Sequence, residues 1–170
     1  MKLGYRNARS AILFLAGLLA IALNHTMDGY AAVFGISLIV SSAITLLYVF
    51  MRFDENINQK VVMEMIVDGF SGLVLFTYPT SDQFFLLIVF AFWMVFNGTL
   101  FLTSGLMEEK NKPNIWLYVL SGIMTIVLGF VILNYNADYM GSVLYLIGFT
   151  LIIYSGINLY LVIKIKRDIY

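Results

Sequence analysis

The residues best able to do chemistry follow one another along a single apolar segment. Lys60, Glu64 and Asp68 recur at intervals of four residues, which places their side chains on one face of a helix. Asp68 lies about midway along that segment, where a carboxylate costs roughly 2.5–3.5 kcal/mol on membrane-insertion scales. This stripe indicates either a proton path or a lined cavity. In the structural alternative, Asp68 stays protonated and hydrogen-bonds to Asn97 or Asn158 while the other two side chains reach the interface.

Two asparagines lie well inside other apolar segments. Buried amides such as Asn97 and Asn158 commonly join membrane helices by hydrogen bonds, and contact with a substrate is the alternative. With Asp68 and Glu64 they make up a candidate intramembrane polar site.

His25 is the only histidine. Its unperturbed pKa permits pH sensing, although a solvated turn residue is the simpler interpretation. A lone histidine is a poor metal site. Asp28, Asp82 and Asp138 each precede an apolar segment and suit helix capping; a ring of acids that binds cations is the alternative.

Catalytic signatures are missing from the sequence. The chain has no cysteine, which excludes disulfides and thiolate chemistry, and it has no nucleophilic triad, phosphate-binding loop or dinucleotide fingerprint. A formal net charge of zero gives no bias toward nucleic acid. We therefore expect a protein that is not an enzyme and has no cofactor, metal or nucleic-acid partner.

The elements that must position these residues are membrane helices. Of the 170 residues, 61% are hydrophobic and 12% are charged, unlike a soluble domain. About 20 apolar residues cross a bilayer, and the chain has six such runs, which predict one all-α membrane domain over residues 1–170. The runs are Ser10–Leu23, Tyr30–Met51, Val61–Tyr78, Phe84–Met107, Ile115–Leu133 and Tyr139–Ile163.

The first run is the weakest of the six. Its apolar core, Ala11–Leu23, follows Lys2, Arg6 and Arg9, a pattern that also suits a signal peptide. No small-x-small cleavage motif follows it, so a retained helix is the better interpretation. In that helix we expect Arg9 to snorkel to the membrane surface.

The basic residues predict the orientation of the spans. All of them fall in the N-terminal tail, the alternate connecting segments or the C-terminal tail, and these parts are cytoplasmic by the positive-inside rule. With six spans, both termini are then cytoplasmic. The basic residues are Lys2, Arg6, Arg9, Arg52, Lys60, Lys110, Lys112, Lys164, Lys166 and Arg167.

Glycine spacing predicts three repeated helical hairpins, at about 9–53, 59–107 and 114–165. Gly17, Gly72 and Gly129 occupy corresponding places in the first helix of each hairpin, and Gly35 and Gly148 correspond in two of the second helices. Parallel repeats are common in membrane proteins. Because small residues allow close backbone approach in lipid, we expect them at helix contacts. The further stripes are Ala16, Ala20 and Asn24, then Ser37, Ser41 and Thr45, and finally Ser121, Thr125 and Gly129.

Two stretches carry a family resemblance. The last hairpin contains WLYVLSGIMTIVLGFVILNYN and SVLYLIGFTLIIYSGINLYLVIKIKR, and the middle one contains GFSGLVLFTYPTSDQFFLLIVFAFWMVFNGTLFLT. These resemble the HdeD family of small acid-resistance membrane proteins, many of unknown function. The chain departs from the family in having one outer proline, Pro79, where Asn24 and Asn136 stand in the other hairpins. The resemblance implies six spans, glycine-spaced hairpins and a role at low pH, and it implies no catalytic residue.

These observations lead to one expected function and two alternatives. The expectation is a non-enzymatic, multi-pass protein of the bacterial cytoplasmic (inner) membrane that acts in acid or envelope stress as a scaffold or a modulator of proton leak. The first alternative is a small transporter or channel centred on Asp68. The second is an accessory subunit of a larger membrane complex. The expected partners are the lipid bilayer and either another membrane protein or a second copy of the chain.

Overall fold

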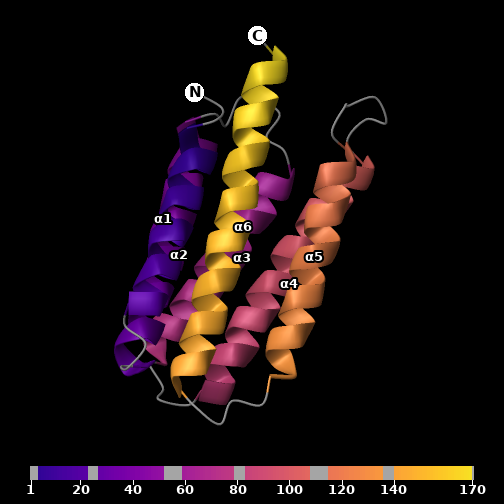
Figure 1. Cartoon of the computed structure of the whole chain (residues 1–170). Coiled ribbons are helices and arrows are strands. Elements are labelled where there is room, and N and C mark those ends of the chain that lie inside the picture. The colour runs from indigo at the N-terminus through magenta and orange to yellow at the C-terminus, as the bar shows by residue number, and fades with distance from the viewer. Residues whose placement is uncertain are drawn as a thin grey trace.

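The computed structural model of the chain is a bundle of six α-helices that run up and down in alternation (Figure 1). It describes residues 4–22, 27–51, 59–78, 83–107, 115–135 and 140–169. The helices are α1 (Gly4–Ala22), α2 (Met27–Met51), α3 (Gln59–Thr77), α4 (Gln83–Met107), α5 (Ile115–Leu133) and α6 (Met140–Ile169). The start of α1 and the end of α6 lie at the same end of the bundle. We call the half of the bundle at that end the terminal half and the other the distal half.

Four helices are long and apolar enough to cross a membrane. They are α2, α4, α5 and α6, over Tyr30–Met51, Phe84–Leu106, Ile115–Leu133 and Val143–Ile163. The protein is therefore a helical membrane protein, as its composition predicts. The other two described helices, α1 and α3, have as many residues as α5 but carry the charges of the stripe and of the N-terminal segment.

Four of the five charged side chains of α1 and α3 are buried inside the bundle, the fifth, that of Arg6, is partly buried, and the outer faces of both helices are largely apolar. On α1, Leu15 is 58% exposed, and on α3, Phe70 and Leu73 are similarly exposed. A soluble protein has the opposite distribution, with charged side chains outside and apolar side chains inside. The outward faces of α1 and α3 are thus apolar, as are those of the four strongly apolar helices.

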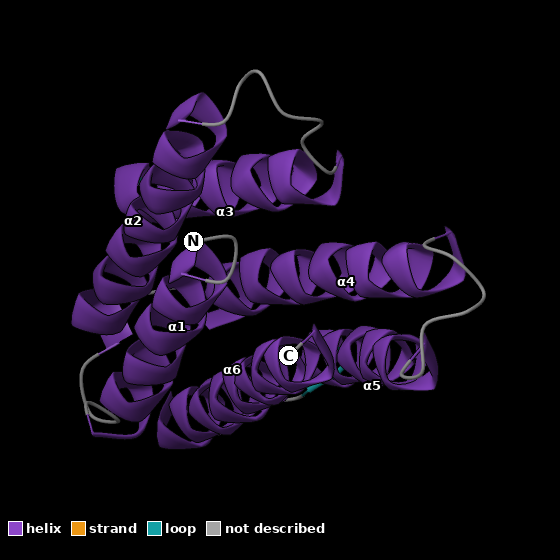
Figure 2. Ribbon diagram, turned by 90° about the horizontal axis from the view of Figure 1, so that it is seen from above, coloured by secondary structure: helices purple, strands orange, loops and turns teal. Residues whose placement is uncertain are grey.

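The closest helix contacts join α2 with α3, α4 with α5 and α6 with α1. The first two of these pairs are consecutive in the chain, whereas the third brings its first and last helices side by side. Figure 2 shows the helices from above, with α1 next to both α2 and α6. The contact between α5 and α6 is sparse by comparison.

Glycines lie at the centre of each close pair. A Cβ atom added to Gly17 would lie 2.9 Å from the carbonyl oxygen of Gly148, and one added to Gly72 would lie 2.9 Å from that of Gly35. One added to Gly122 would lie 2.8 Å from the carbonyl oxygen of Gly98. The backbones can approach this closely only because no side chain separates them. The prediction that small residues form the helix contacts is confirmed at these positions.

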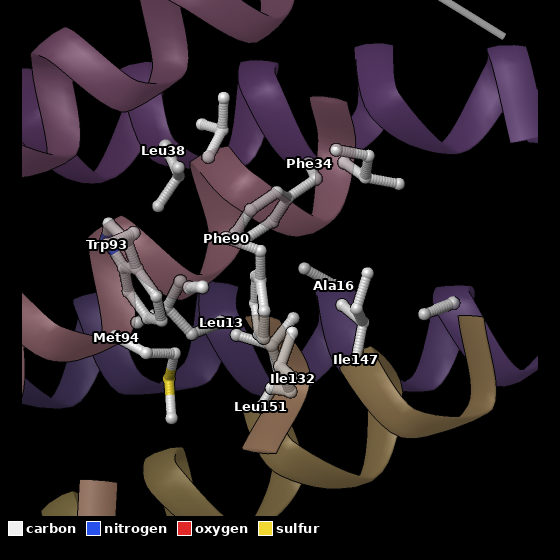
Figure 3. Packing of buried hydrophobic residues seen from close by; sticks show 14 of the residues in the cluster. Leu13, Ala16, Phe34, Leu38, Phe90, Trp93, Met94, Ile132, Ile147 and Leu151 are labelled. Carbon is white, nitrogen blue, oxygen red and sulfur yellow. The ribbon is translucent and has the colours of Figure 1, made fainter. Parts of the chain in front are cut away.

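The core of the distal half is apolar and aromatic. Phe34 and Phe90 are fully buried, with ring centroids 5.3 Å apart, and Trp93 packs against both rings. Figure 3 shows these rings with the leucine and isoleucine side chains of α1, α5 and α6 around them. The described side chains of this half include no charged group.

Several sequence predictions fall on residues that the structure does not describe. These are His25, Asp82, Asp138 and the outer-turn residues Asn24, Pro79 and Asn136. Asp28 belongs to the first turn of α2, but its side chain is likewise outside the description.

Candidate functional site: a buried charge cluster

All five charged side chains that the structure describes gather in one place. They are Arg6, Arg9, Lys60, Glu64 and Asp68, and they lie between the terminal end and the middle of the bundle. Lys60, Glu64 and Asp68 share the buried face of α3, as their four-residue spacing predicts. The two arginines come from the corresponding part of α1. We call these five residues the charge cluster.

Asp68 and Arg9 form a two-pronged ion pair at the inner end of the cluster. Nε of Arg9 lies 2.8 Å from Oδ2 of Asp68, and Nη2 lies 3.0 Å from Oδ1. The Ser41 hydroxyl donates to Oδ2 at 2.8 Å, and the Trp93 indole donates to Oδ1 at 2.8 Å. Each carboxylate oxygen thus accepts two hydrogen bonds, and Asp68 is 0% exposed. Such bidentate, charge-assisted pairs are the strong class of hydrogen bond.

The guanidinium of Arg9 also binds α4 and α6. Its Nη2 donates to Oδ1 of Asn97 at 2.8 Å, and its Nη1 donates to the Tyr154 hydroxyl at 3.3 Å. The Tyr154 hydroxyl in turn donates to the same Asn97 oxygen at 3.0 Å. Asn97 completes its bonding by donating from Nδ2 to the carbonyl oxygen of Trp93. One arginine therefore ties the first helix to α3, α4 and α6.

Lys60 and Glu64 form the outer part of the cluster. Nζ of Lys60 lies 3.7 Å from Oε1 of Glu64, and Nη1 of Arg9 lies 3.8 Å from Oε2. The Lys60 ammonium also lies 4.0 Å from the centroid of the Phe101 ring, a favourable cation–π distance. These contacts fall at the side of the cluster that faces the terminal end.

A small cavity lies beside this outer part. Its volume is about 10 Å³, enough for one water-sized particle. Its walls come from α1, α3, α4, α5 and α6. Two of these helices, α5 and α6, make only sparse contact with each other. The lining residues are Arg6, Arg9, Ser10, Lys60, Glu64, Phe101, Tyr118, Asn158, Leu161 and Val162.

The structure brings three of the four residues of the predicted polar site together. Asp68, Glu64 and Asn97 all contact Arg9. Asn158 is separate: its Nδ2 donates to the backbone of Tyr154 within α6, and the side chain lines the cavity. The predicted structural partnership of Asp68 with Asn97 or Asn158 is replaced by the ion pair, and Arg9 stands between Asp68 and Asn97.

Arg9 corrects one sequence prediction. It does not snorkel to the membrane surface but turns inward and is 4% exposed. A guanidinium in an apolar interior needs an anion and several acceptors, and Asp68, Asn97 and Tyr154 supply them inside the bundle. The signal lay in the spacing: Arg9 precedes Ala16 by seven residues and Ala20 by eleven, so it shares their inward face.

Trp93 and Tyr154 have roles that the sequence does not predict. Trp93 is completely buried, and its indole N–H donates a hydrogen bond to Asp68. Tyr154 was not singled out, although it lies deep within its helix, away from the interfaces where tyrosines gather. A polar ring at that depth is a signal for a buried hydrogen bond.

The chemistry open to the cluster is binding and stabilisation. The described residues contain no group of three or more metal-ligating side chains, and the Asp68 carboxylate is already saturated by four donors. Beyond Asp68, the Ser71 and Tyr30 hydroxyls are buried without a hydrogen-bond partner among the described residues. The aromatic core of Phe34, Phe90 and Trp93 separates the cluster from the distal end.

Comparisons with known proteins add one match. Residues 66–134 match a family described as "Short repeat of unknown function (DUF308)". The matched stretch runs from the middle of α3 to the end of α5, and it contains Asp68, Trp93 and Asn97 but not Arg9. No curated protein matches the chain. No solved structure matches it either.

Proposed function

We propose that this protein is a non-enzymatic scaffold of the bacterial cytoplasmic membrane, of HdeD-like type, that acts in acid or envelope stress. The observation that carries the proposal is the saturated Arg9–Asp68 pair, which joins the first helix to three others and leaves the carboxylate no free position for a substrate. A group used in this way fixes the shape of a bundle. A protein of fixed shape with an apolar outer surface is suited to binding another membrane protein.

We further propose that all six helices span the bilayer with both termini in the cytoplasm. The apolar outer faces of α1 and α3 support this arrangement, because four of their five charged side chains are buried inside the bundle and Arg6 is partly buried. The distribution of lysine and arginine supports the orientation. Cysteines introduced singly into the connecting segments would test both points, since a membrane-impermeant thiol reagent added to intact cells would label only the outer segments.

The experiment that tests the function is acid survival of cells that lack the protein. Wild type should restore survival, and so should the control Ser37→Ala, because the Ser37 hydroxyl binds only the backbone of its own helix. Asp68→Asn should fail to restore survival, with the amount of protein in the membrane measured alongside. If deletion leaves survival unchanged in several media, the stress role is wrong.

A small transporter or channel is the second candidate, and the cavity beside Glu64 and Asn158 favours it. Such a function needs a route past the aromatic core in at least one conformation. Purified protein in liposomes with a pH-sensitive dye inside would reveal it as a proton or ion flux that Glu64→Gln changes. A scaffold predicts no flux above that of empty liposomes, and an accessory subunit predicts a stable partner after mild solubilisation.

A further inference from the structure

The cavity beside the charge cluster has more positive than negative groups around it. Arg6, Arg9 and Lys60 line it, against the single carboxylate of Glu64. Asp68, which does not line the cavity, forms an ion pair with one of these cations, Arg9. Over the whole cluster, three cations therefore face two carboxylates, which leaves an excess of one positive charge in a largely buried setting.

Two side chains of the lining have hydrogen-bond donors without an acceptor among the described residues. Ser10 is 4% exposed, and its hydroxyl makes no hydrogen bond with any residue that the structure describes. Arg6 donates from Nε to the Tyr5 hydroxyl at 3.2 Å, and its two Nη atoms make no hydrogen bond with a residue that the structure describes, although the guanidinium interacts electrostatically with Glu64 and Tyr118. Buried donors are ordinarily satisfied, so the Ser10 hydroxyl indicates that an acceptor belongs in the cavity, and the partly buried Arg6 supplies further donors to the lining.

We propose that this cavity binds a single halide-sized anion. The excess positive charge and the free donors of Ser10 and Arg6 select an anion over a cation. A cavity of about 10 Å³ admits one particle the size of a water molecule, which excludes a phosphate group or an organic carboxylate. Glu64 lies at the same cavity and lowers the affinity by repulsion. The inference goes beyond the scaffold role and does not depend on it.

The test uses the full-length protein purified in detergent micelles. Its melting temperature is measured against increasing sodium fluoride, chloride or bromide, with sodium gluconate added to keep the sodium concentration constant. Gluconate is too large for the cavity and serves as the reference anion. We expect a saturable rise in melting temperature with at least one halide, because a ligand that binds only the folded state stabilises it.

Variants of the lining residues test whether the ion bound in the cavity is an anion. Arg6→Gln should raise the halide concentration for half-maximal effect by about tenfold, and Glu64→Gln should lower it by a similar factor. Ser10→Ala removes a donor without changing the charge, and it should raise the halide concentration for half-maximal effect by about threefold. This variant keeps the test open if a charge variant does not fold. Ser37→Ala removes a hydroxyl on α2 that does not line the cavity, and it should behave as wild type.

Three results would overturn the proposal. The first is a melting temperature that responds equally to every halide and to gluconate. The second is a Glu64→Gln variant that weakens the halide effect. The third is a stabilisation that follows the identity of the cation when sodium is exchanged for N-methylglucamine.

Discussion

In the terminal half of the bundle, the described helices meet through charged and amide groups as well as aromatic rings, whereas in the distal half they meet through aromatic rings and aliphatic side chains. Arg9 and Asp68 hold the first kind of contact, at 2.8 and 3.0 Å. Phe34, Phe90 and Trp93 hold the second, with ring centroids 5.3 to 5.9 Å apart. Trp93 belongs to both, because its ring packs in the aromatic core and its N–H binds the carboxylate.

The difference shows what each kind of contact contributes inside a membrane. Apolar contacts between helices compete with equally apolar lipid, so they stabilise by close fit and not by removal from water. An ion pair in the same place has no alternative partner in the lipid, and therefore it specifies which helices must meet. The terminal half thus determines the arrangement of the helices, and the distal half determines how tightly they pack.

Breaking the ion pair should have the largest effect. Arg9→Met leaves Asp68 buried without its cation, and Asp68→Asn leaves Arg9 without its anion, so each should cost about 4 kcal/mol of unfolding free energy. The combined variant Arg9→Met/Asp68→Asn should lose much less than the sum. Reversible unfolding in mixed micelles measures these values. Single variants as stable as wild type would show that the pair does not hold the bundle together.

Truncation in the aromatic core should have the next largest effect. Phe90→Ala removes a fully buried ring between Phe34 and Trp93 and should cost about 3 kcal/mol. The exposed Phe92 on the same helix is the matched control, and Phe92→Ala should change the free energy of unfolding by less than about 1 kcal/mol. Equal losses at the two positions would mean that the distal core is not tightly packed.

Filling a glycine contact should have a smaller effect. Gly122→Ala places a methyl group 2.8 Å from backbone atoms of α4 and should cost about 2 kcal/mol. Gly156→Ala has nothing within 4 Å and should be neutral, or stabilising by up to about 1 kcal/mol through helix propensity. The same unfolding measurement compares them. The reverse order would contradict the close approach of α4 and α5.

Removing one neutral donor from Asp68 should have the smallest effect. Ser41→Ala deletes one of the four hydrogen bonds to the carboxylate and should cost about 0.6 kcal/mol, the average for such bonds in membrane proteins. Ser37→Ala on the same helix should cost less, since its hydroxyl binds the backbone of α2. A loss as large as that of Arg9→Met would show that Ser41, and not the arginine, holds the carboxylate.

The sequence predicts the helices well because bilayer thickness constrains them so strongly. All six apolar runs correspond to helices in the structure, and the inward stripe of Lys60, Glu64 and Asp68 follows from helical periodicity alone. The close helix contacts at Gly17 and Gly72 are predictable because a residue without a side chain lets two backbones approach.

The partner of Asp68 could not be read from the sequence in the same way. Arg9 is 59 residues away from Asp68, and its long side chain near a helix end can extend either outward or inward. Its direction depends on how α1 is rotated against α3, α4 and α6, which is a property of the assembled bundle. For the same reason the pairing of α1 with α6 by Gly17 and Gly148 was not foreseen.

The four-helix reach of Arg9 has a consequence for how the protein is made. Translation produces Arg9 first, Asp68 next, then Asn97, and Tyr154 nearly last. The guanidinium therefore exists well before the groups that will bind it. Until the third helix emerges, Arg9 has no carboxylate of α3 to pair with, and so the final packing of α1 against α3, α4 and α6 is a late event in biogenesis.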